Sequence, residues 1–285
     1  MRLLTYTDGG GPQAGILLDE EIVPVSALGA GDASVRGLLA EHDAAGLAEL
    51  GRRAEASGTR LPRASVKLLA PVPDAQKVIC MGLNYRDHAE ESGQEIPEYP
   101  RWFAKFANSL AGDGEDVILP AAHPDYVDYE AELAVVIGRA AHRVAAADAL
   151  DHVAGAMPFN DVSARDLQLQ NPLWTSGKAI DTFAPCGPAL VTLDEAGDLQ
   201  NLALRTRIDG EIVQQGNTRD MIFSVAETIA WLSRTLTLEP GDIIATGTPA
   251  GVGGAKGTFL RAGQTVAVEV DGLGAVHSPI RAEAP

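Results

Sequence analysis

The sequence has little cysteine, few aromatic residues and a shortage of positive charge. Its two cysteines, Cys80 and Cys186, lie in separate apolar stretches and no C-x-x-C spacing occurs, which argues against a disulfide scaffold. We expect both to be buried as small hydrophobic residues. The 22 Lys and Arg residues are outnumbered by 39 Asp and Glu residues, giving a net charge of −17. So acidic a chain argues against nucleic acid and anionic membranes as partners, although a local site can still bind a small anion.

Long apolar runs are also missing. No stretch approaches the roughly 18 residues of a membrane span. The first residues, MRLLTYTDGGGP, lack the apolar core of a signal peptide, so we expect a cytoplasmic protein.

What the sequence has in quantity is glycine and proline. Thirty glycines and 17 prolines in a chain that is 46% hydrophobic and 21% charged are typical of an ordered protein with many turns and short strands. Predicted strands do not alternate regularly with helices, which argues against a doubly wound sheet. We therefore expect an α+β, β-rich fold.

The order of patterns predicts two units. Residues 1–70 form a small N-terminal α+β domain, with a hairpin, a further strand and one helix over 34–57, and residues 61–78 read as a link into a main domain of residues 71–285. In that domain we expect strands over 127–138 and 202–218, the latter with an Asp-Gly hairpin turn. Residues 148–168 are expected to mix helix and loop. Residues 84–93 predict a short helix with Asn84 as N-cap and Gly93 as stop, and 224–238 give the clearest helix.

Two glutamates mark a candidate metal site. Glu130 and Glu132 are two positions apart in a predicted strand and so share one face, with Asp128 beside them and a core-forming segment after them. Like charges near a core are costly unless compensated, and Mg²⁺, Ca²⁺ or Mn²⁺ would do so. For this pair alone a solvent-facing acidic patch is the favoured alternative. Asp161 offers a third carboxylate, or a helix cap.

Several other polar residues can have either a functional or an ordinary structural role. His88 and Glu91 are spaced so that a carboxylate can orient an imidazole, or form an exposed helical pair. Arg165 and Gln168 can share a helix face, and Lys178 can be an ordinary surface lysine. The glycine-rich loop after residues 243–245 has N–H groups that could hold a carboxylate or phosphate. Zinc-protease, Walker, dinucleotide-binding and serine-hydrolase signatures are absent from the sequence.

Six segments in order carry a specific resemblance: GLNYRDHAEE, FAKF, DYEAELAVVIG, NDVSARDLQ, SGKAIDTFAPCGP and PGDIIATGTPAGVG. Together they resemble the fumarylacetoacetate hydrolase family, of the bacterial acylpyruvase and 2-hydroxyhepta-2,4-diene-1,7-dioate isomerase type, over residues 75 to 275. The resemblance implies the family's C-terminal-domain-like mixed β-sandwich or roll. It also implies a homodimer whose interface lies in this β-rich domain.

The resemblance assigns roles to ten residues. Those matching metal ligands, for Mg²⁺ or Mn²⁺ with Ca²⁺ possible in a crystal, are Glu130, Glu132 and Asp161. Those matching catalytic groups are His88 and Glu91, on a mobile lid helix, and Lys178. Those matching substrate-binding groups are Lys105, Arg165, Gln168 and Thr248.

The implied activity is metal-dependent chemistry on small anionic 2-oxo or 2,4-dioxo carboxylates. Hydrolysis of a C–C bond in an acylpyruvate-type substrate, through a metal-bound enolate, is favoured because both His88 and Glu91 are present. Isomerisation of the dienedioate and decarboxylation of oxaloacetate on the same site are the alternatives. A metal-binding or ligand-binding module without turnover is the alternative of another class.

Overall fold

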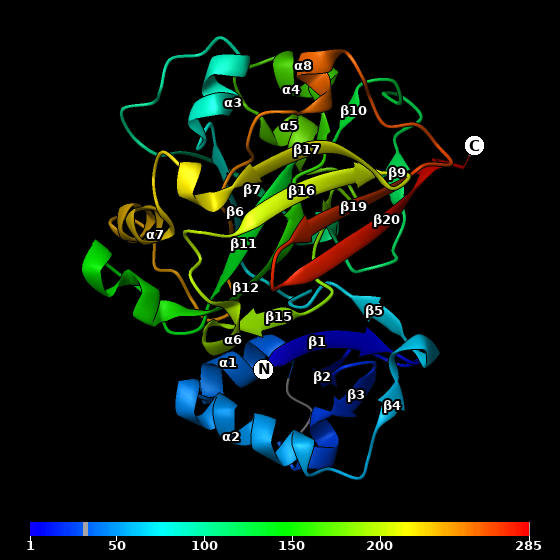
Figure 1. The fold of residues 1–285 in the computed structure, drawn as a ribbon, viewed down its shortest axis with the longest axis vertical. Helices are drawn as coiled ribbons and strands as arrows, with labels where there is room; N and C mark the ends of the chain where they lie inside the picture. Colours follow the sequence, from blue (N-terminus) through cyan, green and yellow to red (C-terminus); the bar gives the residue numbers. More distant parts are fainter. Residues whose placement is uncertain (31–33, 285) are drawn as a thin grey trace.

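The computed structural model describes residues 1–30 and 34–284, and most of its strands belong to two sheets (Figure 1). The larger sheet has eleven strands, in the spatial order β4 (Leu61–Pro62), β3 (Glu21–Pro24), β2 (Gln13–Leu18), β1 (Arg2–Thr7), β15 (Leu190–Thr192), β12 (Val153–Asn160), β11 (Ala131–Ile137), β18 (Ile243–Ala245), β6 (Val78–Gly82) and β7 (Arg101–Lys105), with β5 (Lys67–Leu69) also paired to β1. The smaller sheet has five strands, in the order β17 (Glu211–Asn217), β16 (Ala203–Ile208), β19 (Thr265–Val270), β20 (Gly274–Ala282) and β9 (Val117–Leu119).

Two two-stranded sheets and a set of short helices make up the other regular elements of the described residues. Two two-stranded sheets are formed by β10 (Val127–Asp128) with β13 (Ser163–Ala164) and by β14 (Ala184–Pro185) with β8 (Leu110–Ala111). The α-helices are α1 (Val35–Glu41), α2 (Ala44–Glu55), α3 (Arg86–Glu91), α4 (Arg165–Leu169), α5 (Thr175–Lys178), α6 (Leu193–Ala196), α7 (Val225–Ser233) and α8 (Gly253–Lys256). The 3₁₀ helices are η1 (Val25–Leu28), η2 (Arg63–Ser65), η3 (Ala107–Ser109), η4 (Ala146–His152) and η5 (Thr218–Asp220). None of the described helices has the length and apolar character needed to cross a membrane.

Strand β11 runs between two hydrophobic cores. It pairs with β12 on one side and β18 on the other, and all seven of its residues are buried. Ala134 and Val136 pack into the core shared with the N-terminal unit, and Leu133 and Val135 pack into the core beneath the five-stranded sheet. Burial on both faces explains the continuous apolar run LAVVI after Glu132. The expected α+β, β-rich class is confirmed.

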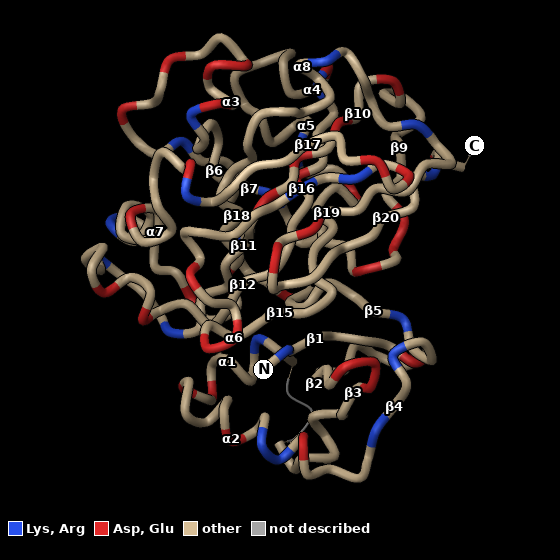
Figure 2. The backbone as a smooth tube through the Cα atoms, in the orientation of Figure 1, with Lys and Arg blue, Asp and Glu red and all other residues tan. Residues whose placement is uncertain are grey.

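The N-terminal unit continues the large sheet. Strand β1 pairs with β2 inside the unit and, on its other side, with β15 of the main domain, so one sheet crosses the predicted boundary at residue 70. Figure 1 shows the unit, coloured blue to cyan, at the lower end. In Figure 2 the Asp and Glu positions are spread over both units, so no single segment carries the acidic excess. The division into two domains stays a prediction.

Three predicted elements are corrected. Residues 34–57 form two helices because the Asp43 side chain accepts the N–H of Gly46 and caps a new helix. The expected link 61–78 contains β4 and β5. Residues 153–160, expected as helix and loop, form the central strand β12. Gly155 lets this strand approach β15, because a Cβ there would lie 2.1 Å from the carbonyl oxygen of Val191.

Candidate functional site

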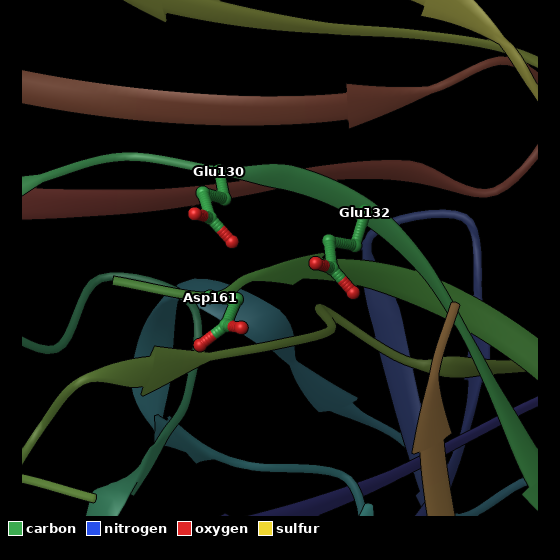
Figure 3. A group of neighbouring side chains, drawn as sticks. All are labelled: Glu130, Glu132 and Asp161. Carbon is green, nitrogen blue, oxygen red and sulfur yellow. The ribbon is translucent and has the colours of Figure 1, made fainter. Parts of the chain in front are cut away.

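Three carboxylates converge where β11 and β12 meet. The antiparallel register pairs Glu132 with Phe159, and Asp161 follows β12 and donates its backbone N–H to the carbonyl of Glu130 at 3.0 Å. One ligand atom from each of Glu130, Glu132 and Asp161 lies within 4.8 Å of the other two, and all three residues are buried (Figure 3). The structure therefore brings the three predicted ligands together.

The cluster suits a hard divalent cation. Burial, Asp161 and Glu130 together raise the pKa of Glu132 well above its usual range. Its Oε2 accepts the N–H of Gly247 at 2.8 Å, whereas the buried Oε1 has no hydrogen-bond partner among the described residues. Oxygen ligands from several carboxylates are what Mg²⁺ and Mn²⁺ prefer. The donor set and the unpaired Oε1 therefore fit such an ion.

Two buried lysines hold the cluster. Lys178 Nζ donates to Glu130 Oε2 at 2.7 Å and to Asp161 Oδ2 at 2.8 Å, and Lys105 Nζ donates to Asp161 Oδ1 at 2.5 Å. Burial lowers the pKa of Lys105. Burial acts in the same direction on Lys178, but the charges of Asp161 and Glu130 outweigh it and raise the pKa. Lys105 also donates to the Val162 carbonyl and does not line the cavity described below, so a substrate-binding role for it stays a prediction.

Arg165 is fixed by carboxylates on both sides. Its Nη1 lies 2.7 Å from Glu130 Oε1 and 2.9 Å from Gln168 Oε1, and its Nε and Nη2 donate to Asp128 Oδ2 at 2.8 and 2.6 Å. Burial alone would raise the pKa of Glu130, but Lys178 and Arg165 lower it to about 2. The sequence placed Asp128 beside the glutamates; its role as the partner of Arg165 was missed.

The glycine-rich loop binds carboxylates of the protein itself. Gly253 and Gly254 donate their N–H groups to Asp128 at 2.8 Å, and Gly251 donates to both oxygens of Glu91 at 3.0 Å. The expectation that these N–H groups hold a carboxylate is met by side chains of this chain. The loop thereby fixes both the partner of Arg165 and the glutamate of the predicted dyad.

His88 and Glu91 lie on α3 with their side chains facing each other. His88 Nδ1 is 3.5 Å from Glu91 Oε2, too long for a hydrogen bond, and is buried without another partner among the described residues. The helix starts after Tyr85. Asn84 is not its cap, because its amide bonds the carbonyls of Phe223 and Thr246.

Thr248 joins the loop to the strand that carries the glutamates. Its hydroxyl donates to the Ala131 carbonyl at 2.8 Å and accepts from Gln214 Nε2 at 2.7 Å. Gln214 Oε1 in turn accepts the backbone N–H of Ala131 at 2.9 Å. Sequence reasoning missed Gln214, and its only signal is an amide side chain on an otherwise ordinary hairpin.

A cavity of about 490 Å³ opens over these groups. The predicted site residues that line it are His88, Glu91, Glu130, Arg165, Gln168, Lys178 and Thr248. Glu132, Asp161 and Lys105 are not part of the lining, and each is at most 2% exposed. Much of the lining comes from α3, α4, α5 and α8, which lie at the upper end in Figure 1, and β6 and β7 contribute to it as well. Such a cavity, with acid–base groups above buried carboxylates, can bind and polarise a small anion.

Comparisons with known proteins define the class. Residues 77–281 match the model of the fumarylacetoacetate (FAA) hydrolase C-terminal domain, and residues 1–71 match an "Rv2993c-like, N-terminal" model. The chain belongs to the fumarylacetoacetate hydrolase family, as its motifs predicted.

Three relatives illustrate the range of activities in the family. The chain is 46% identical over 224 residues to the human mitochondrial oxaloacetate tautomerase FAHD2A, covering 77% of this chain and 71% of the relative. Maleylpyruvate hydrolase from Sphingobium sp. SYK-6, solved with manganese(II) and pyruvate, matches with TM-score 0.83 and 31% identity over the whole of both chains. The 2-hydroxyhepta-2,4-diene-1,7-dioate isomerase from Mycobacterium marinum matches with TM-score 0.77 and 32% identity, again over both whole chains.

Proposed function

We propose that this protein is a Mg²⁺- or Mn²⁺-dependent enzyme that hydrolyses a C–C bond of an acylpyruvate. The observation that carries the proposal is the placement of His88 and Glu91 on the same cavity as Glu130 and Lys178. A tautomerase or isomerase needs only to move a proton, whereas a histidine that faces a carboxylate on the wall of a cavity is suited to activating water. A small anionic 2-oxo acid is accordingly the proposed partner.

Glu130, Glu132 and Asp161 would hold the divalent ion. When bound, that ion supplies Lewis acidity and positive charge toward the carboxylate and keto oxygens of the substrate. Arg165 keeps Glu130 ionised and Lys105 keeps Asp161 in place, so two of the three ligands stay oriented. The manganese and pyruvate named for the Sphingobium relative support this choice of ion and substrate class.

The remaining steps belong to side chains of this chain. Glu91, held by the N–H of Gly251, lies 3.5 Å from His88 Nδ1, and a small approach of the two side chains on substrate binding would make this a hydrogen bond that leaves Nε2 to take a proton from water. The resulting hydroxide adds to the acyl carbonyl carbon, and the bond from that carbon to C3 of the pyruvate portion breaks. The electron pair delocalises onto the 2-oxo oxygen, where the Lys178 ammonium offsets the charge. His88 returns the proton to C3, which yields a carboxylic acid and pyruvate.

Oxaloacetate tautomerisation is the second candidate, and the 46% identity to the human tautomerase favours it. In that reaction His88 would move a proton between C3 and the enol oxygen, and no water would attack. Decarboxylation of oxaloacetate and isomerisation of a dienedioate likewise need no attacking water.

A coupled assay separates these reactions. Acetylpyruvate is incubated with enzyme and Mg²⁺ or Mn²⁺, and pyruvate release is followed with lactate dehydrogenase alongside loss of enol absorbance. We expect both signals together, their loss in EDTA, and their loss in His88→Ala but not in His152→Ala, which changes a histidine of η4 outside the cavity lining. Enol conversion of oxaloacetate without pyruvate release from acetylpyruvate would favour the tautomerase instead.

A further inference from the structure

One wall of the cavity turns apolar immediately beside Lys178. The Lys178 Nζ lies 5.1 Å from the centroid of the Phe103 ring, and Phe103 meets Trp174 edge to face with centroids 5.8 Å apart. Met81 and Leu83 line the same cavity. Hydrophobic surface therefore extends from the charged end of the site for the length of at least two aromatic rings.

A glycine makes room for this wall. A Cβ on Gly82 would lie 2.2 Å from Cζ3 of Trp174, so a side chain at position 82 would displace the indole. Gly82 itself lines the cavity. The position of Trp174 thus depends on the absence of a side chain on the strand beneath it.

Some of the remaining apolar lining is more exposed. Tyr126 and Phe259 meet edge to face at 5.2 Å, and the side chain of Leu169 is 78% exposed although it lines the cavity. A leucine this exposed gains by burying its surface against an apolar ligand.

The positive charges of the lining are already engaged. Arg165 is held by Asp128 and Glu130, and Lys178 by Glu130 and Asp161. Both cationic side chains therefore lie at the end of the cavity that contains the carboxylate cluster.

A further charged group of the lining is acidic. Asp166 lies there, with its Oδ2 2.6 Å from His123 Nδ1. Arg101 donates to Gln94 at 3.3 Å but is not part of the described lining. A second substrate carboxylate would lose hydration here without meeting an uncommitted cation of the described lining, which is costly.

We infer that the cavity selects an uncharged, apolar group at the far end of its 2-oxo acid substrate, such as a medium-length alkyl or an aryl chain. This inference rests on the proposed function for its reaction, but not for its binding preference. It sets the chain apart from the named relatives, because oxaloacetate, maleylpyruvate and the heptadienedioate all carry a second carboxylate.

Turnover gives the first test. The kcat/KM for acetyl-, butanoyl-, hexanoyl- and benzoylpyruvate is compared with that for fumarylpyruvate. We expect a rise of roughly fourfold per added methylene over the first few carbons, and fumarylpyruvate no better than acetylpyruvate. Trp174→Ala and Leu169→Ser should flatten the rise, and Leu169→Ser tests the idea without threatening the fold because that side chain is exposed. Trp102→Ala is the matched control: Trp102 neighbours Phe103 on β7 but does not line the cavity.

Binding without turnover gives the second test. Titration calorimetry in Mg²⁺ with 2-oxobutanoate, 2-oxohexanoate, 2-oxooctanoate and 2-oxoadipate measures chain-length preference whether or not any bond is cleaved. Affinity rising along the monocarboxylates, with 2-oxoadipate weaker than 2-oxohexanoate, supports the inference even if no acylpyruvate is hydrolysed, in which case only the proposed reaction fails. Tighter binding of 2-oxoadipate, or faster turnover of fumarylpyruvate than of hexanoylpyruvate, overturns the inference and leaves the proposed reaction standing.

Discussion

Replacing Glu132 by Gln tests the carboxylate cluster most directly. The amide can keep the hydrogen bond from the N–H of Gly247, so the fold should persist. At 4.8 Å and an effective dielectric constant of 20, two carboxylates repel by about 3 kcal/mol. Glu132 faces two such neighbours, although its raised pKa lets it keep a proton and so relieves part of the repulsion. Without added metal, Glu132→Gln should therefore be at least as stable as the parent.

Metal should reverse that order. A cation at about 100 times its dissociation constant stabilises the parent by about 2.7 kcal/mol, which corresponds to a rise in melting temperature of roughly 4 to 5 °C for a chain of 285 residues. The variant should lose most of this rise, together with metal-dependent turnover. Differential scanning fluorimetry at graded Mg²⁺ and Mn²⁺, with EDTA as zero, measures the effect.

A buried acid away from the cluster supplies the control. Asp242 accepts hydrogen bonds from Lys77 and from the backbone of Glu239. Asp242→Asn should lower the melting temperature and keep the parent's metal-induced rise. If Glu132→Gln keeps that rise as well, or stays fully active in EDTA, Glu132 is not a ligand.

Four further outcomes are expected. His88→Ala should lose hydrolysis by roughly 10² to 10⁴-fold while keeping the metal-induced rise in melting temperature, and parental turnover would remove His88 from the mechanism. Hydrogen exchange over residues 84–100 should slow when oxalate and Mg²⁺ are added, because α3 carries few buried residues and closes the cavity; unchanged exchange would contradict a lid. Light scattering at micromolar concentration should give a homodimer, and a monomer would refute it. The hydrogen bond to Asp113 raises the pKa of His277 above 6.5. Burial alone would raise the pKa of Asp113, but its hydrogen bonds with His277 outweigh burial and lower that pKa below 3.8. The pair therefore stabilises the fold most between about pH 4 and 6.5, where both groups are charged. The melting-temperature difference between parent and His277→Gln should then shrink as the pH rises above 6.5, and a difference independent of pH would argue against this coupling.

Local patterns predicted much of the fold correctly. The Asp209-Gly210 turn joins β16 to β17, with both residues at positive φ, and α7 begins with a capping box at Ser224 and Glu227. These features depend only on neighbouring residues, which the sequence displays.

Elements defined by distant partners were harder to predict. The small residues of β12 give no strand pattern, and its strand form depends on the flanking β11 and β15. The two helices of residues 34–57 looked continuous because Asp43 fits the polar side of one long helix as readily as it caps a new one.

The site shows the same division. Spacing alone indicated that Glu130 and Glu132 share a face, but only the register of β11 and β12 brings Asp161 to them. The burial of Lys105 could not be predicted from the sequence, because the carboxylate that compensates its charge, Asp161, is 56 positions away. The contacts of the glycine-rich loop with Asp128 and Glu91 likewise join residues more than 120 positions apart.

The pairing of β1 with β15 has a consequence for how the chain is made. Met1 and Thr192 are hydrogen-bonded although 191 positions separate them, and Arg2 pairs with Val191. Strands β2 and β5, which also pair with β1, are made early, but at about 5 to 20 residues per second β15 follows β1 only after roughly 10 to 40 s. Through that interval the part of the strand's edge at Arg2 and Leu3 lacks its partner and is open to other nascent chains. A ribosome paused before residue 192 would lengthen the exposure, which makes the first strand the segment of this protein with most to gain from a chaperone.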